Sequence, residues 1–379
     1  MNRWVKRVSE SVSFLYYAVQ TIKRSALFWC SMLVCVIATF PLRVDAAQQV
    51  APSDAVKNLV LYNWEDYMDP ELLAQFEQET GIHVDQIYYE TDELKDQFLL
   101  TTEGKGIDLV VTSGISLYSY IPAGWLSVLD DQFLSNAGNV DQRWTEFNTE
   151  AANYAVPLLW GTLGIAYRKD KILEPVHSWM DLFEPKPYLN QKIMMIDDSR
   201  DSMGMALKAL GYSINSEDVA ELKQATALLK KQKPFVSAYS YLNLGENSEL
   251  VTGRIWMAMA YSGDVQLLKQ YKPEIEYALP KEGTNLWVDY IAVVARSERK
   301  VAAMQFINFL LDPKHAAQLS SYTSTATTVG GAKAFLSEEH LGNELIYPKA
   351  EALSHSESYH SLSSKGVRLR NIYFSEVNN

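Results

Sequence analysis

The sequence predicts an α/β protein of two lobes, each with a mainly parallel sheet flanked by helices. Short apolar runs alternate with amphipathic segments over residues 58–113, and a similar alternation returns over residues 193–261. Between them, Tyr154–Gly164 is extended, broken by a proline and crossed by two glycines, which is typical of a passage between lobes. The length of 379 residues is too great for one compact core but suits two.

The first predicted element is a buried strand, because Leu59–Tyr62 is a short apolar run. A helix is expected over Pro70–Thr80, with Asp69 as its N-cap and Gly81 as its C-cap. Further elements of this lobe are expected as a strand at Ile82–Tyr89, a helix at Asp92–Thr102 and a strand at Ile107–Thr112. This order is the doubly wound pattern of a parallel sheet. The rings of Tyr118, Tyr120 and Trp125 are expected to pack a helix beneath the sheet, although Tyr118 can also face a cleft.

The second half of the chain repeats the alternation. Its expected strands are Ile193–Ile196, Arg254–Tyr261 and Leu286–Ala295, and its expected helices are Asp201–Leu210, Glu217–Lys231, Lys300–Leu311 and Pro313–Ser321. A polar tail rich in Ser, Glu and His follows. We assign residues 57–161 and about 288–332 to the first lobe, and residues 162–287 and about 333–379 to the second, with a hinge around Trp160–Thr162 and near Trp287.

Residues 1–46 have the features of a signal peptide. A long basic region precedes the apolar run Ala26–Leu42, and Val44-Asp45-Ala46 supplies small residues for cleavage after Ala46. An uncleaved membrane anchor is the alternative, for which the apolar run is slightly short. Both cysteines, Cys30 and Cys35, lie in this segment, so the exported chain has no disulfide, thiolate metal site or cysteine nucleophile. The bacterial periplasm is the compartment that we expect.

The charge of the exported chain is strongly negative. Residues 1–46 carry six Lys/Arg and two Asp/Glu, and their removal leaves 28 basic and 44 acidic residues, a formal charge of −16. Nucleic-acid binding is therefore not expected, because phosphate recognition needs the opposite sign. A cationic ligand is favoured, although part of the excess is ordinary solubilising surface.

The loop after the first strand is the first candidate site. Trp64, Glu65, Asp66 and Tyr67 place two rings around two carboxylates, and ligands bind at the carboxyl ends of strands in open α/β sheets. Carboxylates attract an ammonium, while ring faces attract it and cover its methylenes. The simpler interpretation is an exposed acidic loop with two rings in the core.

Other expected strand ends carry the same residue types. The full set of acids is Glu65, Asp66, Asp198, Asp201, Asp264 and Asp289, and the rings are Trp64, Tyr67, Tyr261 and Trp287. Spaced anions and flat apolar walls suit an elongated, multiply charged amine. Several such contacts together can reach micromolar affinity, about −8 kcal/mol.

Six segments together resemble a known family. YNWEDYMDPELLAQFEQETG, IDLVVTSG, YAVPLLWGTLGIAYRKD, IDDSRD, LPKEGTNLWVDYIAV and INFLLDP are similar, in that order, to the bacterial periplasmic spermidine/putrescine-binding proteins. The resemblance covers about residues 57–350. It implies the two-lobed type II periplasmic binding protein fold, with a ligand cleft between the lobes that closes over a polyamine. It also implies a membrane partner, either the permease of an ATP-driven importer or a signalling receptor, as in the norspermidine sensor branch.

The resemblance also implies ligand positions. Trp64, Glu65, Asp66, Tyr67 and Ser113 match those of the first lobe. Asp198 and Asp201 match the pair of acids in the second lobe, although the family more often has a glutamate at 201. Tyr261 falls where a tryptophan is common, and Trp287 and Asp289 match the WxD pair of the family. Tyr118, Thr325 and Tyr359 are further candidates. Ile115 and Thr325 stand where tyrosines are usual, and Tyr359 falls near a polar amide position, which leaves ligand length and affinity open.

Other classes of function fit the sequence less well. Paired acids such as Asp198 and Asp201 can serve a hydrolase, but there is no GxSxG elbow and no catalytic residue is expected. The scattered histidines form no HExxH or EF-hand, so we expect neither a metal site nor a cofactor; calcium at the acids is disfavoured by the tryptophans. A protein that only binds a macromolecular partner is the second alternative. We expect a monomer with a small polyamine ligand, preferentially a triamine because the acids lie in both lobes.

Overall fold

The computed structural model describes residues 57–378. The predicted signal segment 1–46, its cleavage site after Ala46 and both cysteines therefore lie outside the described residues. Within residues 57–378, no helix is long and apolar enough to cross a membrane.

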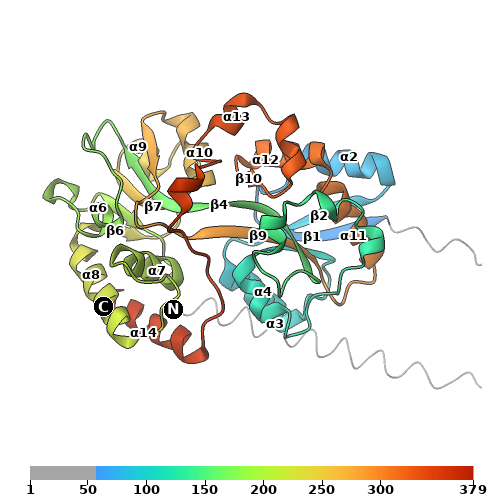
Figure 1. Ribbon diagram of the computed structural model, residues 1–379, viewed down its shortest axis with the longest axis horizontal. Coiled ribbons are helices and arrows are strands. Elements are labelled where there is room, and N and C mark those ends of the chain that lie inside the picture. Colours follow the sequence, from blue (N-terminus) through green and yellow to red (C-terminus); the bar gives the residue numbers. More distant parts are fainter. Residues whose placement is uncertain (1–56, 379) are drawn as a thin grey trace, which may run out of the picture. The chain divides into compact units, whose positions relative to one another are not determined.

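One continuous sheet organises the described chain (Figure 1). Its strands are β1 (Asn58–Asn63), β2 (His83–Tyr88), β3 (Leu109–Ser113), β4 (Ala155–Arg168), β5 (Ile193–Met195), β6 (Val236–Tyr239), β7 (Met257–Tyr261), β8 (Ile275–Ala278), β9 (Leu286–Val293) and β10 (Ala326–Thr327). Eight of them follow the order β2-β1-β3-β9-β4-β7-β5-β6, and β8 and β10 both pair with β4. The strands predicted from apolar runs are present at both ends of this order.

The two outer parts of the sheet are parallel, and its middle is antiparallel. β1 runs parallel to β2 and β3, and β5 runs parallel to β6 and β7. The central strands β4 and β9 are antiparallel to each other and to their outer neighbours β7 and β3. The parallel pattern predicted for each half thus holds for its outer strands, whereas the antiparallel middle comes from pairings between residues far apart in the chain.

The predicted passage between the halves is the 14-residue strand β4. Up to Thr162 its residues pair with β9, and from Leu163 onward they pair with β7 and β8. Gly161 lies just before this change of partner, and a Cβ at this position would overlap the ring of Trp287. The glycine therefore allows the indole to lie directly against the β4 backbone.

Helices cover the sheet. They are α2 (Pro70–Thr80), α3 (Asp92–Thr102), α4 (Gly114–Tyr120), α5 (Gln142–Thr145), α6 (Trp179–Phe183), α7 (Ser199–Ala209), α8 (Val219–Gln232), α9 (Glu249–Thr252), α10 (Ser262–Tyr271), α11 (Lys300–Leu310), α12 (Pro313–Thr323), α13 (Glu338–Gly342) and α14 (Ser364–Asn378). Helix α2 has the predicted caps: the Asp69 side chain accepts a hydrogen bond from the Glu71 N–H, and Gly81 adopts the left-handed conformation.

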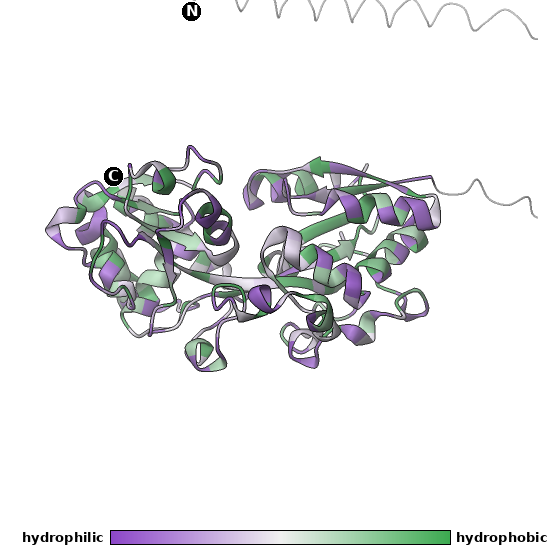
Figure 2. Ribbon diagram, turned by 90° about the horizontal axis from the view of Figure 1, so that it is seen from above, coloured by the Kyte–Doolittle hydropathy of each residue, from purple (hydrophilic) through white to green (hydrophobic). Residues whose placement is uncertain are grey.

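Two apolar clusters form the core. The larger contains β1, β3 and α11, with buried residues such as Leu61, Val110 and Phe306. The second contains β5, α7 and α8, including Met195 and Leu207. Figure 2 shows hydrophobic colour along the strands and hydrophilic colour on outer helix surfaces, as burial of one helix face requires.

The C-terminal segment corrects one prediction. Residues 364–378, expected as a polar tail, form helix α14, whose Phe374 and Val377 are buried in the second cluster. Arg370 on the same helix is also buried and donates hydrogen bonds to the carbonyls of Ile214 and Ser216. Residues 370, 374 and 377 follow helical spacing, but the many serines around them masked this short periodicity.

Candidate functional site

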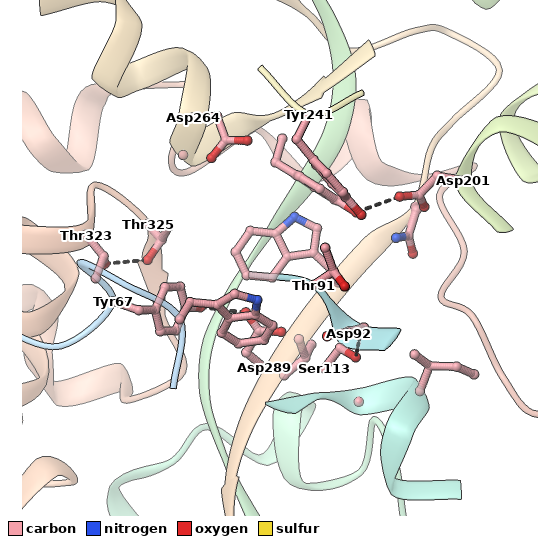
Figure 3. A pocket seen from close by; sticks show the side chains of 18 of the residues that line it. Tyr67, Thr91, Asp92, Ser113, Asp201, Tyr241, Asp264, Asp289, Thr323 and Thr325 are labelled. Carbon is pink, nitrogen blue, oxygen red and sulfur yellow. Dashed lines mark hydrogen bonds between the residues drawn. The ribbon is translucent and has the colours of Figure 1, made fainter. Parts of the chain in front are cut away.

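A cavity of about 1290 Å³ opens at the strand ends of the sheet. Every residue predicted for ligand contact lies in its wall: Trp64, Glu65, Asp66, Tyr67, Ser113, Tyr118, Asp198, Asp201, Tyr261, Trp287, Asp289, Thr325 and Tyr359. Figure 3 shows the carboxylates of Asp201, Asp264 and Asp289 on different sides of it. The cavity thus brings together side chains that are up to 295 positions apart in the chain.

Sheet topology explains this convergence. The loop 64–67, Ser113 and Tyr261 follow or end β1, β3 and β7. Strand β9 runs antiparallel to β3, so its beginning lies beside the end of β3, and Asp289 stands directly opposite Ser113 in the ladder. The carboxyl ends of three strands and the amino end of a fourth therefore face one space.

The first anchor in the cavity is the pair Tyr67 and Asp289. The Tyr67 hydroxyl donates to Asp289 Oδ2 at 2.5 Å, although the residues are 222 positions apart. Asp289 is buried, and burial raises the pKa of its carboxyl group to about 7. Burial and the neighbouring carboxylate raise the pKa of Tyr67 well above its usual value, so the phenol stays neutral and donates.

A second anchor repeats this arrangement in the other half. The Tyr261 hydroxyl donates to Asp201 Oδ2 at 2.5 Å. Burial and the adjacent charge of Asp198 raise the pKa of Asp201. Asp198 itself is the N-cap of α7, with Oδ1 accepting from the backbone N–H groups of Arg200 and Asp201. One of its oxygens therefore already accepts hydrogen bonds from the helix backbone.

Asp92 is a wall residue that the sequence-based prediction missed. Its Oδ2 accepts from the Ser113 hydroxyl at 2.8 Å, and its Oδ1 lies 2.6 Å from Lys95 Nζ. Burial acts to raise the pKa of Asp92, but Lys95 and the two hydrogen bonds outweigh it and lower the value. Asp92 follows the β2 strand closely, so the strand-end position that predicts the other acids also applies to it. It is also the first residue of helix α3, where an acidic residue is common without any role in binding.

Asp264, noted among the strand-end acids, lies in the first turn of α10 and also faces the cavity. Within residues 57–378 its carboxylate has no hydrogen bond or ion pair, and burial raises its pKa to about 7. Thr325 lies close by, since a Cβ at Gly263 would touch its methyl group, and its hydroxyl is hydrogen-bonded to that of Thr323. Two small threonine side chains therefore stand in the wall close to the first turn of α10, where Asp264 lies.

Aromatic rings supply the apolar walls. Trp64 packs edge-on against Tyr67 with centroids 5.1 Å apart, and Tyr261 lies edge-on to Trp287 at 6.3 Å. Tyr118, expected mainly as core, is only partly buried and faces the cavity, while Tyr120 is fully buried against Trp125. The rings of both halves thus lie beside the acids, as the residue pattern predicted.

The cavity wall is strongly acidic. Eight carboxylates line it, namely Glu65, Asp66, Glu90, Asp92, Asp198, Asp201, Asp264 and Asp289. Arg200 is the one lysine or arginine of the described residues in this wall, and it lies near Asp198 and Asp201. Glu65 and Asp66 are exposed, whereas Asp201 and Asp289 are buried. Such a wall favours a ligand that carries several positive charges.

The acids are not arranged as a metal site. In the part of the chain that the structure describes, no group of three or more His, Cys, Asp or Glu side chains is placed to hold a metal ion. Each buried acid of the two anchors instead accepts a hydrogen bond from a tyrosine, at separate points of the wall.

Comparison with known proteins identifies the family. Residues 71–339 match the bacterial extracellular solute-binding protein family. The chain belongs to this family. A spermidine/putrescine-binding periplasmic protein of Escherichia coli is 33% identical over 309 residues, which cover 81% of this chain and 88% of that protein. A norspermidine sensor of Vibrio cholerae is 29% identical over 322 residues, with coverages of 84% and 88%.

Solved structures agree with the fold. A structure described as a spermidine/putrescine ABC transporter from Listeria monocytogenes superposes with a TM-score of 0.77 at 31% identity, covering 85% of this chain and 99% of that one. The family member described here thus has the two-lobed type II periplasmic binding protein fold that the sequence predicted. The family and these relatives are solute-binding proteins and not enzymes.

Proposed function

We propose that this family member binds a linear polyamine in the cavity and presents it to a partner in the inner membrane. The observation that carries the proposal is the repeated pair of a buried carboxylate and a tyrosine, Asp289 with Tyr67 and Asp201 with Tyr261. A tyrosine O–H uses one lone pair of each acid and holds it in place, while other lone pairs stay available to an ammonium.

Each anchor has an aromatic ring beside it. Trp64 packs on Tyr67 and Trp287 lies against Tyr261, so the methylenes of a ligand can run along the rings while its nitrogens meet the acids. Burying such a pair costs desolvation, which the ammonium–carboxylate contact offsets when its hydrogen bonds are complete.

The acids give a preference for ligand length. Asp289 and Asp201 are presented by different halves of the sheet, and Asp264 is a third acid of the cavity wall, half-buried and without a partner in the described chain. Three separated acids suit three nitrogens, so we infer a triamine such as spermidine or norspermidine. Asn285, also buried in the wall, has a side-chain oxygen without a hydrogen-bond donor among the described residues and can accept from a ligand N–H.

The relatives support the choice of ligand, compartment and partner. Their names include spermidine, putrescine, cadaverine and norspermidine as ligands, and periplasmic location for several. These names support our proposal that the protein acts in the periplasm. We propose separately that it acts as a monomer and without residues 1–46. The partner is a permease of an ABC importer or a membrane signalling receptor.

The test is calorimetric titration of the chain from Ala47 with putrescine, cadaverine, spermidine, norspermidine and spermine. Saturable binding of a triamine is expected, with weakened binding in Asp289→Asn and near wild-type binding in Glu338→Gln, a matched change of an acid outside the cavity wall. Absence of binding by any of the five amines, checked at several temperatures because heats can cancel, would overturn the proposal and favour a purely macromolecular partner.

Capture of membrane partners with and without the bound amine separates the two roles. Recovery of permease subunits supports import, and recovery of a receptor with a cytoplasmic signalling domain supports sensing. The amine that binds most tightly in the calorimetric titrations also helps to separate the two roles. Selectivity for norspermidine favours a sensor, and selectivity for putrescine or spermidine favours uptake.

A further inference from the structure

Helix α3 carries a completely buried lysine beside the cavity. Lys95 has 0% of its surface exposed, and lysines are almost never fully buried unless they are paired. Its ammonium lies 2.6 Å from Asp92 Oδ1 and 3.4 Å from the Ser116 hydroxyl oxygen. The burial of this charge is thus accompanied by a close ion pair.

Three aromatic rings surround the same ammonium. Lys95 Nζ lies 5.5 Å from the ring centroid of Trp64, 5.2 Å from that of Tyr89 and 6.0 Å from that of Tyr120. One carboxylate with several ring faces is the environment in which proteins hold organic ammonium groups. Lys95 therefore sits in a cage of the kind proposed above for the ligand.

This cage shares three of its members with the ligand cavity. Trp64, Tyr89 and Asp92 line the cavity, whereas Lys95 does not. The Ser113 hydroxyl donates to Asp92, and Ser113 stands opposite Asp289 in the β3–β9 ladder. Asp92 is thus separated by one side chain from the acid of the first anchor, and its charge is already balanced by the protein itself.

We propose that Lys95 is a specificity-determining residue, whose ammonium fills a cation site beside Asp289 and so limits the number of ligand nitrogens that the cavity accepts. The inference rests on the proposed polyamine function. With Lys95 present, the Asp92 carboxylate is already paired with an ammonium, and the ammonium groups of the ligand pair with Asp289, Asp201 and Asp264. Without the lysine, Asp92 becomes a further acid for an additional ligand ammonium.

The main test compares Lys95→Met with the wild type by calorimetric titration with spermidine and spermine. Spermine has one aminopropyl group more than spermidine and therefore one additional ammonium. Methionine keeps most of the side-chain volume and removes the charge. We expect the ratio of spermidine Kd to spermine Kd to rise at least tenfold in Lys95→Met. The double variant Lys95→Met/Asp92→Asn, which lacks the freed carboxylate, is expected to return the ratio to within about threefold of the wild type.

Unchanged ratios in Lys95→Met, or an equal rise in the double variant, would overturn the inference while leaving the polyamine function intact. Absence of polyamine binding by the wild type would instead refute the proposed function. The two failures are therefore distinguishable in the same set of titrations.

A second measurement covers the case in which Lys95→Met does not fold. Lys95→Ala is purified and its thermal unfolding followed with and without n-propylammonium, which replaces the three missing carbons and the charge. We expect propylammonium to raise the Tm of Lys95→Ala by several degrees more than that of the wild type or of Lys95→Ala/Asp92→Asn. An equal effect on all three proteins would mean that the cage does not accept a free ammonium, and would overturn the inference.

Discussion

Ligand binding by this cavity is expected to depend on pH between 6 and 8. Burial raises the pKa of both Asp289 and Asp264 to about 7, so each carboxyl group is about half protonated at neutral pH in the empty cavity. A ligand ammonium pairs with the ionised form and pulls the pKa of each acid back down. Binding must therefore release protons, and affinity must fall as the pH falls.

The magnitude follows from these values. A single acid that titrates near 7 when free and well below 5 when bound raises Kd roughly tenfold between pH 8 and pH 6, and two independent acids raise it roughly a hundredfold. At pH 7 these two acids together release about one proton per ligand, and Asp201, whose pKa is also raised by burial and by Asp198, adds to this release. Aliphatic amines have pKa values near that of lysine, about 10.4, and stay protonated between pH 6 and pH 8. The change in Kd therefore originates in the protein.

The assay is calorimetric titration with spermidine at pH 6, 7 and 8, in phosphate and in Tris, whose ionisation enthalpies differ. The difference in heat between the two buffers at pH 7 gives the number of protons released. Asp289→Asn is the matched variant. It is expected to release about half a proton less per ligand at pH 7, and its Kd is expected to rise roughly tenfold less between pH 8 and pH 6 than that of the wild type. A constant Kd together with equal heats in the two buffers would refute the reasoning, because the acids would then be ionised before binding or would not contact the ligand.

Three further outcomes are expected. Asp264→Asn should stabilise the free protein at pH 8 by about 1–4 kcal/mol and change little at pH 4. A folded-state pKa above the unfolded value means that stability is lost as the pH rises from about 4 to 7, and equal effects in urea unfolding at both pH values would contradict this. Gly161→Ala should displace the Trp287 ring and weaken polyamine binding at least tenfold. Gly138→Ala is the control, because a Cβ at this position meets open space, and equal Kd values in the two variants would contradict the packing argument. Asp69→Ala should destabilise the fold by about 1 kcal/mol in the same unfolding assay through loss of the α2 N-cap, and an unchanged midpoint would assign the cap no energetic role.

Local features of the fold could be predicted from the sequence because they depend on residues within one or two turns of each other. The α2 boundaries follow from Asp69, Pro70 and Gly81, and β1 follows from an uninterrupted apolar run. Helix α14 escaped prediction because its few apolar residues are diluted by polar ones, and its burial is decided by α7 and α8, which lie more than 100 residues earlier.

The candidate site was predictable as a set of residues, since acids and rings stand at strand ends that one edge of a sheet brings together. Its internal organisation was not. The Tyr67–Asp289 bond spans 222 positions and exists because β9 inserts antiparallel beside β3. Helical spacing placed Lys95 one turn from Asp92, but nothing local indicated that three rings would bury its charge.

The sequence by itself determined which residues form the elements, and which chemistry gathers at their ends, because propensity, capping and strand-end position are short-range properties. Only the tertiary structure decided which acids are buried, which are held by tyrosines, and which is already neutralised by a lysine. The physical reason is that desolvation and pairing depend on neighbours that strand order brings together from distant parts of the chain.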